Sequence, residues 1–294
     1  MDKIIVVNKP HGFTSHDVVN KLRKIFHTKR VGHTGTLDPD ATGVLVVCLN
    51  DATKLVQFLE ADSKEYIAEV LIGKSTDTYD LSGNIIDEKI VDSLTNEEVD
   101  NVLKSFIGQI EQQPPIYSAI KINGKKLYEY ARNNQYIDVP KRNINVFSLE
   151  RISDVSITDG YYCFKIKTFV SKGTYIRSLC YDIAKKLGYP GLMKSLIRTK
   201  SGAYTLDDAS TLEEIESGNF NSFKMLDSLK NYDIIDHEEF NEKALHGMKI
   251  SINKVVEILN KKPSRIVIKS CDTLIAIYEL DEEVKCYRAV RVWN

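Results

Sequence analysis

Residues 43–49, with the sequence GVLVVCL, form a continuous run of apolar and β-branched side chains. A half-buried strand alternates apolar and polar residues, whereas a strand covered on both faces is apolar at almost every position. This run therefore predicts a strand in the interior of a layered fold. Upstream, residues 4–9 predict a second strand, and apolar residues spaced three or four apart over 18–26 predict a helix with Ser15 as its N-cap.

The rest of the chain continues as an alternation of α and β patterns in which strands dominate, so we expect an α+β fold. Further strands are predicted at 64–73, 85–91, either side of the Asn-Gly turn in 121–126, and 161–170; further helices are predicted at 52–60, 96–108 and 174–188. An acidic stretch at 207–235 precedes three strand-like runs, at 264–270, 272–280 and 285–293. We therefore expect two domains, 1–230 and 231–294, the second being a small β-barrel that leans on the first.

Composition narrows the class of protein. Hydrophobic residues at 43% and charged residues at 28% are ordinary for a globular protein, and no apolar run approaches the ~20 residues of a membrane span. The N-terminal apolar run is too short for a secretory signal, so we expect a cytoplasmic protein. The five cysteines are scattered without ligand spacing, so neither disulfides nor structural zinc is expected.

The charges are unevenly distributed, although the formal net charge is only −1. Residues 161–205 contain nine lysines and arginines against Asp182 alone, interleaved with tyrosines and phenylalanines. A basic cluster is often only a solvated face, but aromatic rings among the bases favour a nucleic-acid surface, because bases stack on rings.

A glycine-rich loop, RVGHTGTLDPDATG at 30–43, directly precedes the buried strand. Because Asp38 stands before a proline, its backbone is driven out of the helical region, and the glycines leave room for close approach. A lone Asp-Pro pair is usually a surface turn. A metal site formed by His33, Asp38 and Asp40 has poor ligand spacing, and neither a phosphate loop at 73–75 nor a calcium loop at 76–84 fits its pattern.

The surroundings of Asp38 change this interpretation. GHTGTLDPDATGVL resembles the signature of the TruB family, bacterial tRNA pseudouridine synthases that isomerise the uridine at position 55 in the T loop. Four further segments resemble family motifs in the same order: VNKPHGFTSHDVV, KEYIAEVLIGKSTDTYDLSG, QQPPIYSAIKINGKKLYEYAR and SKGTYIRSLCYDIAKKLG, followed by LIRTKSGAYTL. The resemblance covers residues 3–210 and implies a pseudouridine synthase fold, with a central, mainly antiparallel mixed sheet and a C-terminal PUA-like β-barrel.

The resemblance also implies roles for particular residues. Asp38 matches the catalytic aspartate, Tyr66 the active-site tyrosine, and Arg177 the arginine that pairs with the aspartate. Further positions match substrate-contacting or active-site-region residues of the family: His33, Tyr175, Leu196, Lys9, Lys54 and Asp80.

A carboxylate beside a guanidinium can act as a nucleophile. The reaction breaks the uracil N1–ribose bond, rotates the base and rejoins it through C5, so no cofactor and no metal are expected. Attack at ribose C1′, attack at uracil C6 and removal of a ribose proton all remain open. Tyr66 either stacks on the flipped uracil or assists loss of the C5 proton, and His33 either contacts RNA or is a buried histidine.

The expected partner is the T stem-loop of tRNA. We expect the protein to act as a monomer, with no membrane association and no guide RNA. The competing function from another class is a non-catalytic tRNA-binding folding chaperone, which would lack the aspartate or its arginine. A guide-RNA-dependent relative would be expected to carry larger terminal extensions, and an N-glycosidase would release free uracil.

Overall fold

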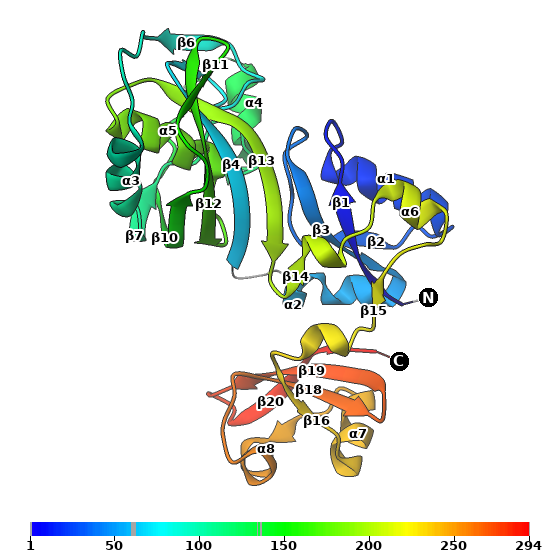
Figure 1. Cartoon of the computed structure of the whole chain (residues 1–294). Helices are drawn as coiled ribbons and strands as arrows, with labels where there is room; N and C mark the ends of the chain where they lie inside the picture. The colour runs from blue at the N-terminus through cyan, green and yellow to red at the C-terminus, as the bar shows by residue number, and fades with distance from the viewer. Residues whose placement is uncertain (1, 60–62, 134, 136, 294) are drawn as a thin grey trace.

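The computed structural model describes residues 2–59, 63–133, 135 and 137–293. Most of its strands belong to one large mixed sheet with the order β15-β1-β3-β13-β4-β12-β10-β7 (Figure 1). Neighbours in this order are antiparallel except β3 and β13, which are parallel. The strands of this sheet, with β2, β11 and β14 attached beside it, are β1 (Ile4–Lys9), β2 (Val31–His33), β3 (Thr42–Leu49), β4 (Ser63–Ile72), β7 (Gly108–Gln112), β10 (Arg142–Arg151), β11 (Ser156–Thr158), β12 (Tyr161–Ser171), β13 (Gly191–Ser201), β14 (Tyr204–Thr205) and β15 (Ser222–Phe223). The predicted central sheet is confirmed.

The strand predicted from the continuous apolar run, β3, is buried on both faces. One face packs against helix α1 (Ser15–Ile25) and α6 (Leu212–Glu216), and the other face packs against Leu55, Phe58 and residues of the C-terminal sheet. Every residue of β3 after Thr42 is buried. This double coverage explains why the run carries no polar alternation.

The predicted N-cap of α1 is wrong by one residue. Thr14 caps the helix: its hydroxyl accepts a hydrogen bond from the Asp17 N–H at 3.0 Å, and the Asp17 carboxylate accepts one from the Thr14 N–H at 2.9 Å. This is a capping box, which needs an acid or amide three residues after the cap. Ser15 is therefore the first helical residue, and its hydroxyl is available for another contact.

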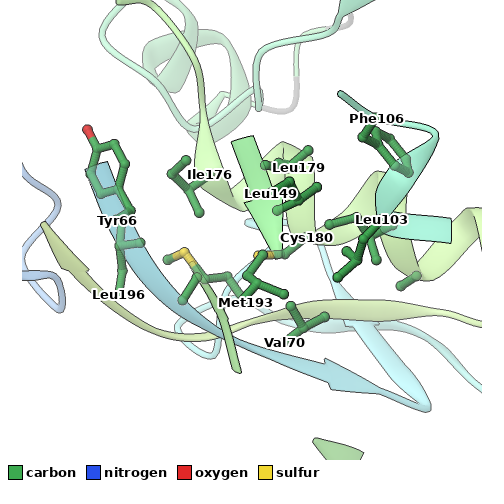
Figure 2. Close-up of a cluster of buried hydrophobic side chains, with 14 of the residues drawn as sticks. Tyr66, Val70, Leu103, Phe106, Leu149, Ile176, Leu179, Cys180, Met193 and Leu196 are labelled. Atoms are coloured by element: carbon green, nitrogen blue, oxygen red, sulfur yellow. The ribbon is translucent and has the colours of Figure 1, made fainter. Parts of the chain in front are cut away.

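The other half of the sheet is covered on one face by α3 (Asn96–Lys104) and α5 (Ile176–Lys186). Figure 2 shows Leu179 and Cys180 of α5 packed with Val70 of β4 and Met193 of β13 in this apolar cluster. Thr95 caps α3 as predicted, but the helix does not run to Gly108. Gly108 has a φ of 107° and begins β7, because only glycine readily takes the backbone conformation that turns the chain into this strand.

Two short hairpins lie outside the large sheet. The first pairs β5 (Lys74–Thr76) with β6 (Ile85–Glu88), so the strand predicted at 85–91 ends at Glu88 and pairs outside the large sheet. All four residues of β6 are exposed, and such a strand buries no apolar face against a neighbouring layer. The second hairpin, β8 (Lys121–Ile122) with β9 (Lys125–Lys126), is the one expected at the Asn-Gly turn, and α4 (Leu127–Arg132) follows it.

Residues 52–60, predicted as one helix, are divided. A 3-10 helix, η1 (Asn50–Leu55), precedes α2 (Val56–Leu59), and residue 60 lies outside the described residues. Two other 3-10 turns are η2 (Leu206–Asp208) and η3 (Asp227–Leu229). None of the helices in the described ranges has the length and hydropathy that a bilayer crossing requires.

The C-terminal strands form a second sheet with the order β16-β18-β19-β20-β17, curled into a half-barrel (Figure 1). Its elements are β16 (Asp233–Ile235), α7 (Glu238–Leu245), β17 (Ile250–Ser251), α8 (Ile252–Leu259), β18 (Arg265–Ser270), β19 (Thr273–Asp281) and β20 (Cys286–Val292). The three strands predicted here are confirmed as β18, β19 and β20. In the described residues the outer strands β16 and β17 do not pair, so the sheet is open rather than a closed barrel.

The second sheet packs directly against the first. Val267, Ile277 and Trp293 belong to the same apolar cluster as Val44 and Phe58. The Trp293 indole N–H also donates to the Asp51 carbonyl at 3.1 Å. The two sheets therefore share a core on this side.

Candidate active site

Asp38 lies in the loop between β2 and β3. The loop begins where the Thr34 N–H donates to the Val46 carbonyl at 3.1 Å, and a turn from the Asp38 carbonyl to the Ala41 N–H at 3.1 Å leads back into β3. The Asp38 side chain is 42% exposed. The chain thus presents this carboxylate in irregular backbone, open to whatever enters from solvent.

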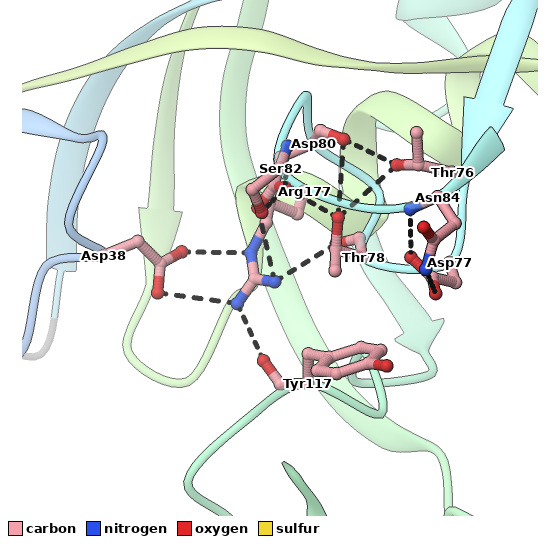
Figure 3. Close-up of polar contacts among 9 residues, drawn as sticks. All are labelled: Asp38, Thr76, Asp77, Thr78, Asp80, Ser82, Asn84, Tyr117 and Arg177. Atoms are coloured by element: carbon pink, nitrogen blue, oxygen red, sulfur yellow. Dashed lines mark hydrogen bonds and ion pairs between the residues drawn. The ribbon is translucent and has the colours of Figure 1, made fainter. Parts of the chain in front are cut away.

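Arg177, in the first turn of α5, lies against this carboxylate. Its Nε is 2.9 Å from Asp38 Oδ2, and its own side chain is only 7% exposed (Figure 3). The guanidinium also donates to the carbonyls of Thr78 at 3.1 Å and Tyr117 at 3.0 Å. A planar guanidinium with several donors suits this arrangement, because it can hold several acceptors in fixed directions at once. Arg177 therefore fixes the orientation of Asp38 and balances its charge.

Asp80 lies on another side of the same guanidinium. Its Oδ2 is 3.5 Å from Arg177 Nη1, and its side chain is 16% exposed. Asp80 Oδ1 accepts hydrogen bonds from the Thr78 hydroxyl at 2.6 Å and the Ser82 N–H at 3.0 Å (Figure 3). Between Thr78 and Asp80, Tyr79 has a φ of 63° and stacks on Tyr181 with ring centroids 4.1 Å apart. The Asp80 carboxylate is therefore held in place by its own loop.

Two cavities meet at Asp38 and Arg177. The larger, about 740 Å³, has Asp80, Tyr128 and Arg132 in its wall. The smaller, about 330 Å³, is lined by three of the predicted substrate-binding residues, Tyr66, Tyr175 and Leu196. Leu196, 7% exposed, is also in the wall of the larger cavity.

Tyr66 and Leu196 lie side by side on β4 and β13, at the edge of the apolar cluster (Figure 2). Tyr66 is only 7% exposed. Burial also raises the pKa of the Tyr175 hydroxyl above its usual value. The smaller cavity thus combines aromatic and apolar side chains with the Asp38 carboxylate and two guanidinium groups, those of Arg177 and Arg198. Such a lining suits a planar heterocycle joined to a sugar.

Two family models match this chain. The model for the TruB family pseudouridylate synthase N-terminal domain matches residues 23–176, and that for the tRNA pseudouridylate synthase B C-terminal domain matches residues 177–246. The chain belongs to the TruB family. The TruB-family motifs that the sequence suggested are thus confirmed as a family relationship, and the chain is an enzyme of the isomerase class.

Named relatives of this TruB-family chain include tRNA pseudouridine synthase B of Staphylococcus aureus (strain MRSA252), 43% identical over 292 residues, which cover 94% of this chain and 93% of the relative. The protein of that name from Bacillus pumilus is 51% identical over 213 residues, covering 72% and 69%. The fold matches a solved H/ACA RNP bound to a substrate RNA containing 2′-deoxyuridine, with a TM-score of 0.71 at 22% identity, covering 99% of this chain and 85% of the other. This confirms the pseudouridine synthase fold.

Not every residue that the TruB resemblance singled out lies in these cavities. Lys9 is fully buried and contacts the loop backbone instead: its ammonium donates to the carbonyls of Pro10 and Pro39, each at 2.9 Å, and of Phe13. Burial lowers the pKa of Lys9 to about 8. Lys54 is on η1, 3.7 Å from Asp51, and lines neither cavity.

His33 lies on β2 and also lines neither of the two cavities. Burial and the nearby Arg198 guanidinium lower the pKa of its imidazole, which favours the neutral ring. Both an RNA contact and a purely structural histidine remain compatible with this placement.

Some of the positive charge predicted for the surface of residues 161–205 is neutralised by ion pairs with glutamates. Lys167 pairs with Glu65 at 3.2 Å and Lys194 with Glu69 at 2.9 Å, all on the large sheet. In the described ranges no three His, Cys, Asp or Glu side chains are grouped so as to hold a metal ion.

The sequence did not reveal the backbone acceptors of the site. The carbonyls of Thr78 and Tyr117 each bind Arg177, but a main-chain carbonyl leaves no mark in a residue type. Tyr117 lies within a segment that resembles a TruB motif, which is the one signal that could have drawn attention to it.

Proposed function

We propose that this enzyme converts uridine to pseudouridine at position 55 in the T loop of tRNA, with Asp38 as the reactive carboxylate. The observation that carries the proposal is the Asp38–Arg177 contact of 2.9 Å at the meeting point of two cavities, in a chain of the TruB family. The tRNA substrate is taken from the names of its relatives from Staphylococcus aureus and Bacillus pumilus.

The reaction moves one bond and needs no outside energy. The bond from uracil N1 to ribose C1′ breaks, the uracil rotates, and a bond from C5 to C1′ forms. The C5 proton is lost to water and N1 takes up a proton, so the product is an isomer of the substrate. Three first steps are possible for Asp38: attack at ribose C1′, attack at uracil C6, or removal of a ribose proton. Each of them requires a carboxylate held at this position. Arg177 keeps the Asp38 carboxylate in this position through all steps of the reaction.

The smaller cavity would receive the flipped uridine. Its walls offer the Tyr66 ring for stacking and Leu196 for apolar contact, which offsets the few kcal/mol needed to extrude a base from a folded loop. Tyr175 lines the same space, and its raised pKa keeps the hydroxyl protonated at neutral pH. Tyr66 is also the nearest predicted group that could assist loss of the C5 proton.

The test uses tRNA transcript labelled with tritium at uracil C5. Wild-type enzyme should release tritium to water, whereas Asp38→Asn should lower the rate by at least about 10⁴-fold and still bind tRNA in a filter assay. The matched control is Asp154→Asn, at an aspartate whose side chain is 88% exposed and which should keep the wild-type rate.

Turnover by the Asp38→Asn variant would refute the role of Asp38. Free uracil in the product would reassign the reaction to an N-glycosidase, and tRNA binding without tritium release by the wild type would favour the folding chaperone. We further propose that the enzyme acts as a cytoplasmic monomer without guide RNA, with its domain boundary near residue 230. The same assay with purified enzyme and transcript alone tests the independence from guide RNA.

A further inference from the structure

The loop that carries Asp38 is bonded to the rest of the protein on both sides of that residue. On the far side, the Pro39 carbonyl accepts hydrogen bonds from the Lys9 ammonium and the Gly12 N–H, each at 2.9 Å. On the near side, Leu37 is bonded through both of its backbone groups to Ser15. The aspartate therefore lies between two neighbours whose backbone is fixed.

Ser15 makes an unusual pair of contacts. Its hydroxyl oxygen accepts a hydrogen bond from the Leu37 N–H at 2.9 Å and donates to the Leu37 carbonyl at 3.3 Å. The side chain is 2% exposed, so water does not compete for these bonds. Because Thr14 is the N-cap of α1, the Ser15 hydroxyl is not used by the helix.

Ser15 is held in place by the packing of helix α1. It is the first residue of α1, and Val18 and Leu22 of that helix are completely buried against the large sheet. A hydroxyl carried by a packed helix is a better reference point than one carried by a loop, because packing fixes its rotamer.

The ends of the same loop are tied by Arg198 of β13. Its guanidinium donates to the carbonyls of Gly35 and Thr36, each at 3.2 Å, and its Nε donates to Val44 at 2.7 Å. Arg198 is 1% exposed and is paired in register with Gly43. A Cβ at position 43 would lie 2.2 Å from the Arg198 carbonyl oxygen, so glycine is required for this approach. Because Arg198 fixes the ends of the Asp38 loop, the contact of Ser15 with Leu37 fixes the backbone in the middle of the loop.

From this geometry we propose that Ser15 is a positioning residue for Asp38. The Leu37 carbonyl belongs to the peptide group that joins Leu37 to Asp38, so the Ser15 hydroxyl fixes the plane from which Asp38 projects. Rotation of that plane would swing the carboxylate away from Arg177. The proposal rests on the proposed function of Asp38, since it concerns the geometry of the same reaction.

The experiment compares Ser15→Ala with wild type in single-turnover tritium release, with enzyme in excess over tRNA. We expect the rate to fall by about 10²-fold, because a catalytic group displaced by about 1 Å loses that much, while the Kd for tRNA stays unchanged. Ser15→Cys, with a similar volume but a weakly hydrogen-bonding thiol, should lose about 10-fold. It tests the same contact if alanine lowers the yield of folded protein.

The matched control is Tyr278→Phe in the C-terminal sheet. Tyr278, like Ser15, is buried, and its hydroxyl donates to the Met248 carbonyl at 2.8 Å. This variant should lower Tm as Ser15→Ala does but leave the single-turnover rate unchanged. A wild-type rate in the Ser15 variants, or an equal loss of rate in Tyr278→Phe, would overturn the proposal. Absence of tritium release by the wild type would instead reject the proposed function.

Discussion

The two loops that flank Arg177 hold their aspartates in different ways. The Asp38 loop, residues 34–41, is fixed through its backbone by side chains from distant elements: Ser15, Lys9 and Arg198. In the Asp80 loop, residues 76–84, the carboxylate itself is held from within, by Thr78 and Ser82. The backbone of this loop is also bound from outside, where the Met193 N–H donates to the Tyr79 carbonyl at 3.0 Å.

This difference separates two carboxylates that share one guanidinium. Asp80 is largely buried and its Oδ1 has its hydrogen bonds satisfied, whereas the Asp38 side chain is 42% exposed and contacts Arg177 without local donors from its own loop. A carboxylate free of competing donors is the better nucleophile, and one that is fully bonded is the better support. This difference supports the proposed role of Asp38 as the reactive carboxylate and favours a supporting role for Asp80 beside Arg177.

A substitution of Asp80 is the most direct test of the different roles of the two carboxylates. Asp80→Asn keeps an acceptor for Thr78 and Ser82 but removes the charge facing Arg177, so we expect kcat to fall by about 10²-fold with KM unchanged. Steady-state tritium release measures this. A loss as complete as that of Asp38→Asn would mean that the two carboxylates are not divided into reactive and supporting roles.

The second test concerns Lys9, which holds the Asp38 loop but not the Asp80 loop. Burial lowers the pKa of Lys9 from 10.5 to about 8, so below pH 8 the folded protein bears the full cost of the buried charge. Between pH 8 and 10.5 the folded state has released a proton that the unfolded chain still binds, and stability rises with pH. From pH 8 to 10 this contribution amounts to about 2 kcal/mol.

Urea unfolding of wild type and Lys9→Met across this range measures that contribution. Because other titrating groups are common to the two proteins, the difference between their unfolding free energies should change with pH in the stated direction. If the difference stayed constant from about pH 8 to 10, the Lys9 ammonium would not be titrating in the folded state.

The smallest effect is expected inside the Asp80 loop. Ser82→Ala removes one donor from Asp80 Oδ1 but leaves the Thr78 hydroxyl bond of 2.6 Å. We expect a loss of about 1 kcal/mol in unfolding free energy and little change in kcat, because the local network still holds the carboxylate. A loss of rate larger than that of Asp80→Asn would show that the loop, rather than the charge, supports Arg177.

Much of the architecture could be predicted because it depends on apolar patterns. The continuous run of β3, the alternation in β12 and the helical spacing of α1 and α5 all record which faces are buried. The errors have more than one source. β6 has no buried face, and Gly108 begins a strand instead of ending a helix. The strands β10 and β13 were not predicted at all, because charged residues interrupt the apolar positions that each of them buries.

The site was accessible to sequence reasoning only in part. Asp38, Tyr66 and Arg177 stand in segments that resemble family motifs, and the structure brings all three to the smaller cavity. Lys54 and His33 also match family positions but do not line that cavity. The contacts of Ser15 with Leu37 could not be predicted, because a helix-capping serine and a loop-holding serine look the same in sequence.

The shared core of the two sheets has a consequence for how the chain can be divided. Trp293, next to the last residue, closes the same apolar cluster as Val44, which lies in the strand that follows the Asp38 loop. Removal of the C-terminal sheet would therefore expose to water one face of β3, the strand that follows the Asp38 loop. Proteolytic trimming or domain exchange would therefore disturb the support of the Asp38 loop, even though the last strands belong to a different sheet from the one that carries this loop.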